Sequence, residues 1–239
     1  MTMQKNNRER NNAPQRPSAA GKGREGRNAG KPQEAAVAQT KAQAKAARDD
    51  AALQQEVDRT VEALRRGGLV LYPTDTVWGL GCDATNAEAV ERIYRLKRSE
   101  NKKSMLVLCA TADMVVRYVD KAPAIAFEVM ELATSPLTAI LPGATGLAAN
   151  LIPDEGTLGV RIPDHAFCQR MLRAFGRPVV STSANISGEA TPARLQEVAR
   201  EIVDGVDFVV NPRFEGHPTR KASSIIAFGE GGEVKIIRK

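Results

Sequence analysis

Residues 69–81 read LVLYPTDTVWGLG, and the interpretation of the whole chain starts from this stretch. Its first part, 69–72, is almost entirely apolar and predicts a short, buried strand. Two hydroxyl side chains, Thr74 and Thr76, follow directly, in a place where ligand-binding loops tend to lie. Gly79 and Gly81 allow the backbone to approach a ligand closely. A strand-exit turn capped by the threonines is an equally good interpretation of these residues alone.

Outward from this stretch, helical and strand patterns alternate before strands gather near the C-terminus. We expect helices at 87–98, 112–119, 123–133 and 166–175, and another that begins at Thr191-Pro192 and runs to about residue 203. Apolar runs predict further strands at 105–109, 137–141, 157–162, 178–181, 208–210, 224–228 and 234–238. This order predicts the α/β class, with a twisted mixed sheet flanked by helices in a single domain.

The N-terminal residues differ in composition from the rest. Residues 1–50 hold 11 Lys and Arg against 5 Asp and Glu, whereas 51–239 hold 23 of each, so the net charge of +6 belongs to the N-terminal part. Residues 1–48 contain no aromatic and few aliphatic side chains, too few to offset the entropy of ordering. We therefore expect a disordered basic tail over 1–48 and a folded domain over 49–239, with its first helix beginning near Asp49-Asp50.

Two possibilities remain open for this tail. Ala35–Arg48 has enough helix propensity to form a frayed helix on its own. The basic side chains either contact RNA phosphates loosely or only add solubility.

Several common catalytic and metal-binding patterns are missing from the sequence. It has no phosphate loop ending in Gly-Lys-Ser/Thr, no G-x-S-x-G turn and no H-E-x-x-H pair. Cys82, Cys109 and Cys168 are too scattered for a disulfide framework or a zinc site, and we expect no protein-bound metal. No apolar run reaches the ~18 residues of a bilayer span, and the first residues lack the apolar block of a signal peptide. We therefore expect a cytoplasmic protein that does not bind membranes.

Four sequence blocks follow one another in the order of a known family. They are YPTDTVWGL at 72–80, LKRSENKKSML at 96–106, GVRIP at 159–163 and STSANISG at 181–188. Together they resemble the signature of YrdC-like threonylcarbamoyl-adenylate synthases, and the resemblance covers roughly residues 53–239. It implies a YrdC-like domain around a concave basic site. It also implies an enzyme that joins ATP, L-threonine and bicarbonate to give threonylcarbamoyl-AMP and pyrophosphate.

The resemblance implies roles for particular residues. For the amino acid it implies Thr76, Arg161, Ser181 and Ser223. For ATP it implies Lys97, Lys103, Thr157, Ser183, Asn185, Thr191 and Arg238. Catalysis is assigned to Lys97, Arg98 and Arg161, because charge neutralisation and positioning suffice when the carbamate oxygen attacks the α-phosphate directly. The planar guanidinium of Arg161 suits a carboxylate.

The same resemblance implies partners. Magnesium is expected with ATP. A downstream enzyme is expected to transfer the threonylcarbamoyl group to tRNA.

One block departs from the family pattern. The family's K-x-R requires arginine at position 99, where this chain has Ser99, and Arg98 stands one position earlier. On a helix, one position turns a side chain by ~100° about the axis. Three alternatives remain: Arg98 turns in from a non-helical end, Lys102 or Lys103 makes the phosphate contact, or activity is weakened.

Two other functions are compatible with the same fold. A non-catalytic RNA- or ribosome-binding module would use the same concave surface, but a folded part with equal numbers of acidic and basic residues argues against it. A carbamoyl-transfer role, like that of the similar domain in hydrogenase-maturation carbamoyltransferases, belongs to much larger proteins with further modules.

Overall fold

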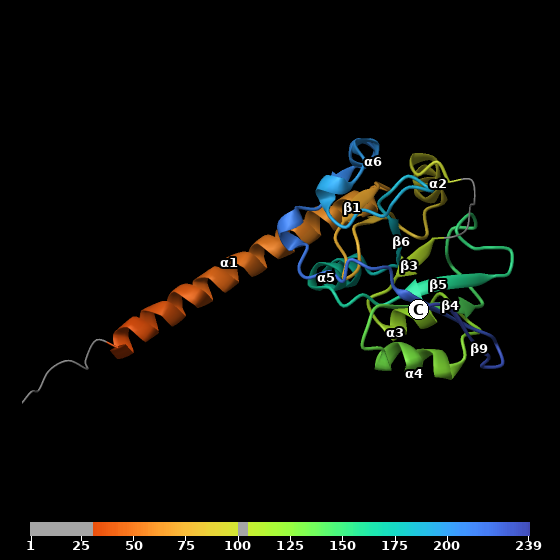
Figure 1. Ribbon diagram of the computed structural model, residues 1–239, viewed down its shortest axis with the longest axis horizontal. Helices are drawn as coiled ribbons and strands as arrows, with labels where there is room; N and C mark the ends of the chain where they lie inside the picture. Colours follow the sequence, from red (N-terminus) through yellow and green to blue (C-terminus); the bar gives the residue numbers. More distant parts are fainter. Residues whose placement is uncertain (1–30, 100–104) are drawn as a thin grey trace, which may run out of the picture. The chain divides into compact units, whose positions relative to one another are not determined.

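The computed structural model describes residues 31–99 and 105–239 (Figure 1). The chain divides into two units, residues 1–46 and 47–239, and the second is the folded domain. The predictions made for residues 1–30 and for Lys102 and Lys103 lie outside the described residues.

The first helix begins earlier than the sequence predicts. Helix α1 spans Lys31–Arg65, so residues 31–48, which we expected to be disordered, are helical. Their composition explains the difference, because alanine has the highest helix propensity and Lys, Gln and Arg follow closely. Val57 and Leu64 of α1 are buried in the core of the folded unit, as their helical spacing predicts.

Among the described residues, nine strands form one sheet in the order β7-β1-β2-β6-β3-β5-β4-β8-β9. They are β1 (Val70–Tyr72), β2 (Gly79–Gly81), β3 (Leu106–Leu108), β4 (Leu137–Pro142), β5 (Thr157–Arg161), β6 (Val179–Ser183), β7 (Phe208–Val209), β8 (Ser224–Phe228) and β9 (Val234–Arg238). The pairs β1–β7, β3–β5 and β4–β8 are parallel. The other neighbours are antiparallel. The predicted α/β class with a mixed sheet is confirmed.

Helices flank this sheet. They are α2 (Ala87–Leu96), α3 (Ala112–Val116), α4 (Ala124–Leu132), α5 (Ala166–Phe175) and α6 (Arg200–Gly205). Helix α2 contacts α6 at one end of the domain, and α4 contacts β4 at the other (Figure 1). The main core joins the helices to the sheet and includes Leu64, Ile93 and Phe167. Within the described part of the chain, no helix is both long and apolar enough to cross a bilayer.

The glycine-rich stretch after Thr76 contains a strand that the sequence did not predict. Strand β2 pairs antiparallel with β1, so that Leu80 lies opposite Leu71. Gly81 is required at this place, because a Cβ there would lie 2.2 Å from the carbonyl oxygen of Val180. Close packing of the backbone against β6, rather than strand propensity, therefore makes this segment a strand.

The prediction of a helix that begins at Thr191-Pro192 was wrong. A short 3-10 turn, η1 (Leu195–Glu197), precedes α6, which begins only at Arg200. The Glu197 carboxylate accepts a hydrogen bond from the Ala193 N–H at 2.7 Å, and Val198 is buried in a cluster with Trp78. These contacts override the local helix-start signal, and Thr191 lies in a loop instead.

Candidate functional site

A cavity of about 250 Å³, the central cavity, lies where several strands of the sheet meet. Strands β2, β3, β5, β6, β8 and β9 contribute to it, together with the loop between β1 and β2. The structure brings together here most of the residues that the sequence predicted for the site: Thr76, Arg161, Ser181, Ser183, Thr191, Ser223 and Arg238. Predicted residues from three of the four sequence blocks thus share one surface with three residues outside the blocks.

The loop between β1 and β2 fixes two threonine side chains. Thr74 Oγ1 accepts hydrogen bonds from the backbone N–H groups of Thr76 (3.0 Å) and Val77 (3.3 Å), and it donates to the carbonyl oxygen of Val77 (2.8 Å). The hydroxyl oxygens of Thr74 and Thr76 are 2.9 Å apart. Thr74 therefore holds the turn; because its own proton goes to Val77, the Thr76 hydroxyl donates to Thr74 and accepts from Arg161.

Arg161, the last residue of β5, is the buried cation of the central cavity, with 4% of its side chain exposed. Its Nη1 donates to Thr76 Oγ1 at 2.8 Å, and its Nη2 lies 3.0 Å from Asp75 Oδ1. Its Nε is buried and has no hydrogen-bond partner among the described residues. A buried donor without an acceptor is costly, so this position suits an anion that accepts from it.

Strands β8 and β9 form another wall of the cavity. Arg238 donates from Nε (3.0 Å) and Nη2 (2.8 Å) to the carbonyl oxygen of Ser223. The Ser223 hydroxyl lies 2.7 Å from that of Thr138, and both residues are buried. Arg238 thereby fixes the entry to β8 with some of its N–H groups, and Thr138 fixes the Ser223 side chain.

Lys97 lies next to the central cavity but not among its lining residues. It is the C-cap of α2 and is 6% exposed. Its Nζ donates to the carbonyl oxygens of Ser183 and Asn185, each at 2.6 Å. Burial lowers the pKa of this ammonium to about 8, because a less polar environment disfavours the charged form. Lys97 therefore ties the end of α2 to the loop that follows β6.

Arg98 points away from the central cavity. Helix α2 ends before it, and its backbone is left-handed with φ 51°. Its exposed side chain forms an ion pair with Glu201 of α6 at 2.7 Å. The alternative in which Arg98 turns in to replace the family arginine is therefore not the arrangement that this structure shows.

Two further predicted residues lie beside the central cavity. The Asn185 side chain donates to the carbonyl oxygens of Ile186 (2.8 Å) and Glu189 (2.9 Å) and so shapes the loop after β6. Thr157 lines an adjacent cavity of about 170 Å³, which shares Leu106 with the central cavity.

Sequence reasoning missed two residues that hold the site together, Asp75 and Thr138, whereas it had singled out Thr74 either as a ligand-binding hydroxyl or as the cap of a turn. Asp75 stands between the two threonines of the motif, so its position was a usable signal. Thr138 carried no signal, because it meets Ser223 only through the pairing of β4 with β8. Within residues 31–99 and 105–239, no group of three or more His, Cys, Asp or Glu side chains is placed to hold a metal ion.

Known proteins resemble this chain in sequence and in structure. The family model Sua5/YciO/YrdC, described as telomere recombination, matches residues 62–239. A protein of Vibrio cholerae serotype O1 named threonylcarbamoyl-AMP synthase is 32% identical over 168 residues, which cover 69% of this chain and 89% of that protein.

Two solved structures share the fold. Sua5 of P. abyssi, solved with L-threonine, has a TM-score of 0.66 at 25% identity; the match covers 72% of this chain and 50% of Sua5. This chain thus spans about half the length of that protein. YciO of E. coli has a TM-score of 0.65 at 25% identity, with 78% of this chain and 89% of YciO covered. The YrdC-like fold that the sequence predicted is confirmed.

Proposed function

The chain belongs to the Sua5/YciO/YrdC family, and we propose that it is an L-threonylcarbamoyladenylate synthase, which forms threonylcarbamoyl-AMP and pyrophosphate from ATP, L-threonine and bicarbonate. The observation that carries the proposal is the buried guanidinium of Arg161. It is oriented by Asp75 and Thr76 and has an Nε without a partner among the described residues. A fixed guanidinium in a cavity of hydroxyl groups is well suited to the carboxylate and hydroxyl of threonine.

The amino acid binds on the Arg161 side of the central cavity. Its carboxylate accepts from Arg161, and its polar groups lie among the hydroxyls of Thr76, Ser181 and Ser223. The support for this assignment is that these side chains line one cavity. Ser181 and Ser223 are nearly fully buried, so they are ordered before the substrate arrives.

ATP binds along the other side, where Ser183, Thr191 and Arg238 line the cavity and Thr157 lines the adjoining one. Lys97 and Asn185 hold the loop after β6 in place, and Lys97 has one ammonium donor beyond its two carbonyl contacts. ATP arrives as its magnesium complex. The described lining of the cavity offers hydroxyl oxygens and no carboxylate, so the phosphates themselves provide the charged ligands of the ion.

The reaction proceeds by direct displacement. The threonine amine attacks the carbon of bicarbonate, water leaves, and the resulting carbamate oxygen attacks the α-phosphorus of ATP with loss of pyrophosphate. The chain contributes charge neutralisation and positioning, not a covalent intermediate. A thiol nucleophile is disfavoured, because burial raises the pKa of Cys82 and Cys168 and keeps both neutral.

The product then passes to a second enzyme that transfers the threonylcarbamoyl group to tRNA in the cytoplasm. The RNA-binding alternative is not favoured. The two arginines that line the central cavity are bound to Asp75 and to a backbone carbonyl, and do not form an open basic face.

The test is pyrophosphate release by the purified full-length chain. We expect release from ATP only when L-threonine and bicarbonate are both present, and the Arg98→Ala variant should match the unmodified protein. Release that persists without either substrate, or no release with all three and magnesium, would contradict the proposal.

A further inference from the structure

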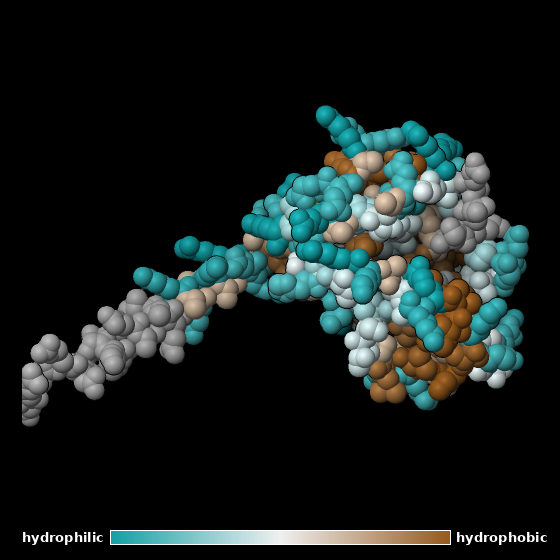
Figure 2. Space-filling view, viewed as in Figure 1, coloured by the Kyte–Doolittle hydropathy of each residue, from teal (hydrophilic) through white to brown (hydrophobic). Residues whose placement is uncertain are grey.

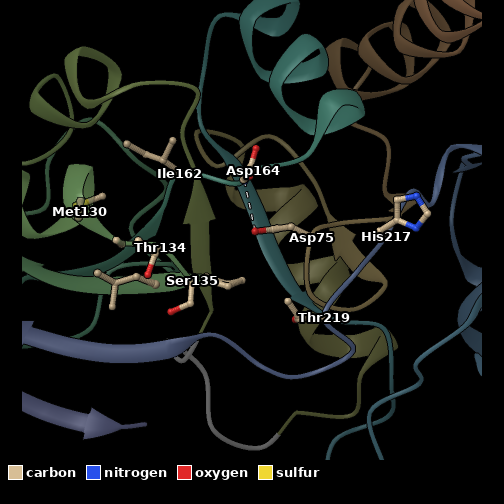
Figure 3. A pocket seen from close by; sticks show the side chains of 11 residues that line it. Asp75, Met130, Thr134, Ser135, Ile162, Asp164, His217 and Thr219 are labelled. Carbon is tan, nitrogen blue, oxygen red and sulfur yellow. Dashed lines mark hydrogen bonds between the residues drawn. The ribbon is translucent and has the colours of Figure 1, made fainter. Parts of the chain in front are cut away.

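A second cavity has a volume of about 350 Å³, and Figure 3 draws the side chains that line it. One ion pair joins its lining to that of the central cavity. The two cavities have no lining residue in common. Asp75 lines the second, Arg161 lines the central one, and their side chains lie 3.0 Å apart. Because Arg161 is the proposed anion contact, anything that changes the charge of Asp75 acts directly on the central cavity.

The lining of the second cavity combines two acidic residues with apolar side chains, three hydroxyl groups and one imidazole. Asp75 and Asp164 lie next to each other: the Asp164 backbone N–H donates to Asp75 Oδ2 at 3.4 Å, and the Asp164 carboxylate is directed away from that bond (Figure 3). Met130 and Thr134 lie on one side of these carboxylates and His217 on the other. No lysine or arginine is among the described residues that line it. Such a lining repels anions and suits a cation with a hydrocarbon arm.

We propose that the second cavity binds an aliphatic ammonium group, and that its occupation strengthens binding of the L-threonine carboxylate in the central cavity. The ammonium binds at the Asp75 carboxylate, with the charge of Asp164 nearby, and its carbon arm lies against Met130 and Ile162. A metal ion fits less well, because no described group of three or more ligating side chains is present. The volume lies near the lower end of the range for small-molecule sites, roughly 300–1,000 Å³.

The coupling follows from the charge of Asp75, and it rests on the function proposed above. Asp75 is the counter-ion of Arg161, so it competes with the threonine carboxylate for the same guanidinium. An ammonium that shares Asp75 cancels part of that negative charge, and Arg161 then attracts threonine more strongly. By linkage, threonine must strengthen ammonium binding by the same factor.

The binding test uses the two histidines as reporters in the full-length chain. His217 lines the second cavity, whereas His165 is buried and bound to the carbonyl oxygen of Glu215, so it serves as an internal reference. We expect 1,4-diaminobutane to shift the ring NMR signals of His217 with a dissociation constant on the order of 1 mM. Asp164→Asn should weaken this binding at least threefold without changing threonine affinity, because its backbone N–H remains.

A second probe, Nα-acetyl-lysine amide, distinguishes the source of the ammonium. Binding of both probes assigns the cavity to lysine side chains as well as free amines, and binding of the diamine alone assigns it to free amines. No His217 shift with either probe overturns the proposal.

The coupling test is calorimetric titration of L-threonine with and without saturating diamine. We expect roughly fivefold tighter threonine binding in its presence, and no difference in Asp75→Asn. Competition between the two ligands, or equal threonine affinity in both titrations, overturns the coupling. If the protein releases pyrophosphate but does not bind the diamine, this inference alone is contradicted. If the diamine shifts the His217 signals but the protein releases no pyrophosphate, the proposed function alone is contradicted.

Discussion

Two buried cations lie at or beside the central cavity, and the chain holds them in different ways. Arg161 lies against the Asp75 carboxylate and the Thr76 hydroxyl. Lys97 lies against two backbone carbonyl oxygens, and burial lowers its pKa to about 8. Burial among neutral acceptors disfavours the charged form of a lysine. The difference teaches that the chain balances one buried cation with a carboxylate and leaves the other among neutral acceptors, where its pKa falls toward neutral.

The contrast concerns two side chains in the interior, whereas Figure 2 shows the outer surface. The visible face carries hydrophilic side chains over much of its area, and its largest apolar region lies near β9 and α4 (Figure 2). Exposed apolar side chains of these elements include Leu132 and Ile236. The two cations, each below a tenth exposed, are instead part of the interior.

The largest expected effect is on stability at the Arg161 side. Arg161→Ala leaves Asp75 nearly buried without its counter-ion and should lower the free energy of unfolding by about 3 kcal/mol. Urea denaturation measures this change in the free energy of unfolding. The double variant Asp75→Asn with Arg161→Ala should recover part of the loss, since no charge is then left unpaired. If Arg161→Ala were as stable as the wild type, the ion pair between Arg161 and Asp75 would not stabilise the fold, and this prediction would be contradicted.

Lys97→Met should have the next largest effect. It removes the donor of two carbonyl oxygens and should cost about 2 kcal/mol of stability, less than an uncompensated charge does. We also expect a higher KM for ATP, a lower turnover, or both, because Ser183 loses its anchor. The matched control is Arg98→Ala one position away. If Lys97→Met had the steady-state kinetics of the wild type, Lys97 would have no role in ATP binding or turnover.

The pH dependence of stability tests the same lysine. Because its folded-state pKa is lowered from 10.5 to about 8, the unfolded chain binds more protons between these values, and stability rises with pH in that window. The stability of wild type relative to Lys97→Met should therefore increase by roughly 1 kcal/mol over the first pH unit above 8 and stay constant below pH 7. A flat difference from pH 7 to 10 would mean that Lys97 is not desolvated.

Arg98→Ala should have the smallest effect. Its exposed ion pair with Glu201 is worth less than about 1 kcal/mol, and it does not line the central cavity. Pyrophosphate release within twofold of wild type is expected. A tenfold loss would mean that Arg98 leaves Glu201 and enters the site when ATP binds.

Much of the fold follows from local patterns, whereas the arrangement inside the site does not. The periodicity of α5 and the apolar runs of β8 and β9 predicted those elements with their observed bounds. The β2 segment could not be predicted, because two of its three residues are glycines and one of its two partners, β6, is distant in sequence.

The candidate site, too, could be predicted only in part from the sequence. The motif blocks predicted some of the side chains that line the central cavity, Thr76, Arg161, Ser181 and Ser183, whereas Lys97 and Asn185 lie beside it. They did not reveal that Lys97 bonds to carbonyl oxygens, since backbone acceptors leave no trace in the sequence. Nor did they predict the direction of Arg98, which depends on where α2 ends. The predicted concave basic site stays a prediction, because two of its lysines lie outside the described residues.

The central claim is that Arg161 receives the carboxylate of L-threonine, and a calorimetric cycle of two ligands and two proteins tests it most directly. L-threonine and L-threoninol, which lacks the carboxylate, are titrated into wild type and Arg161→Ala, with Arg161→Lys in reserve if the alanine variant does not fold. The account predicts that wild type prefers threonine roughly ten- to a hundredfold, about 1.5–3 kcal/mol, and that this preference disappears in Arg161→Ala and is only partly retained in Arg161→Lys. An undiminished preference for threonine in the variants would contradict the claim.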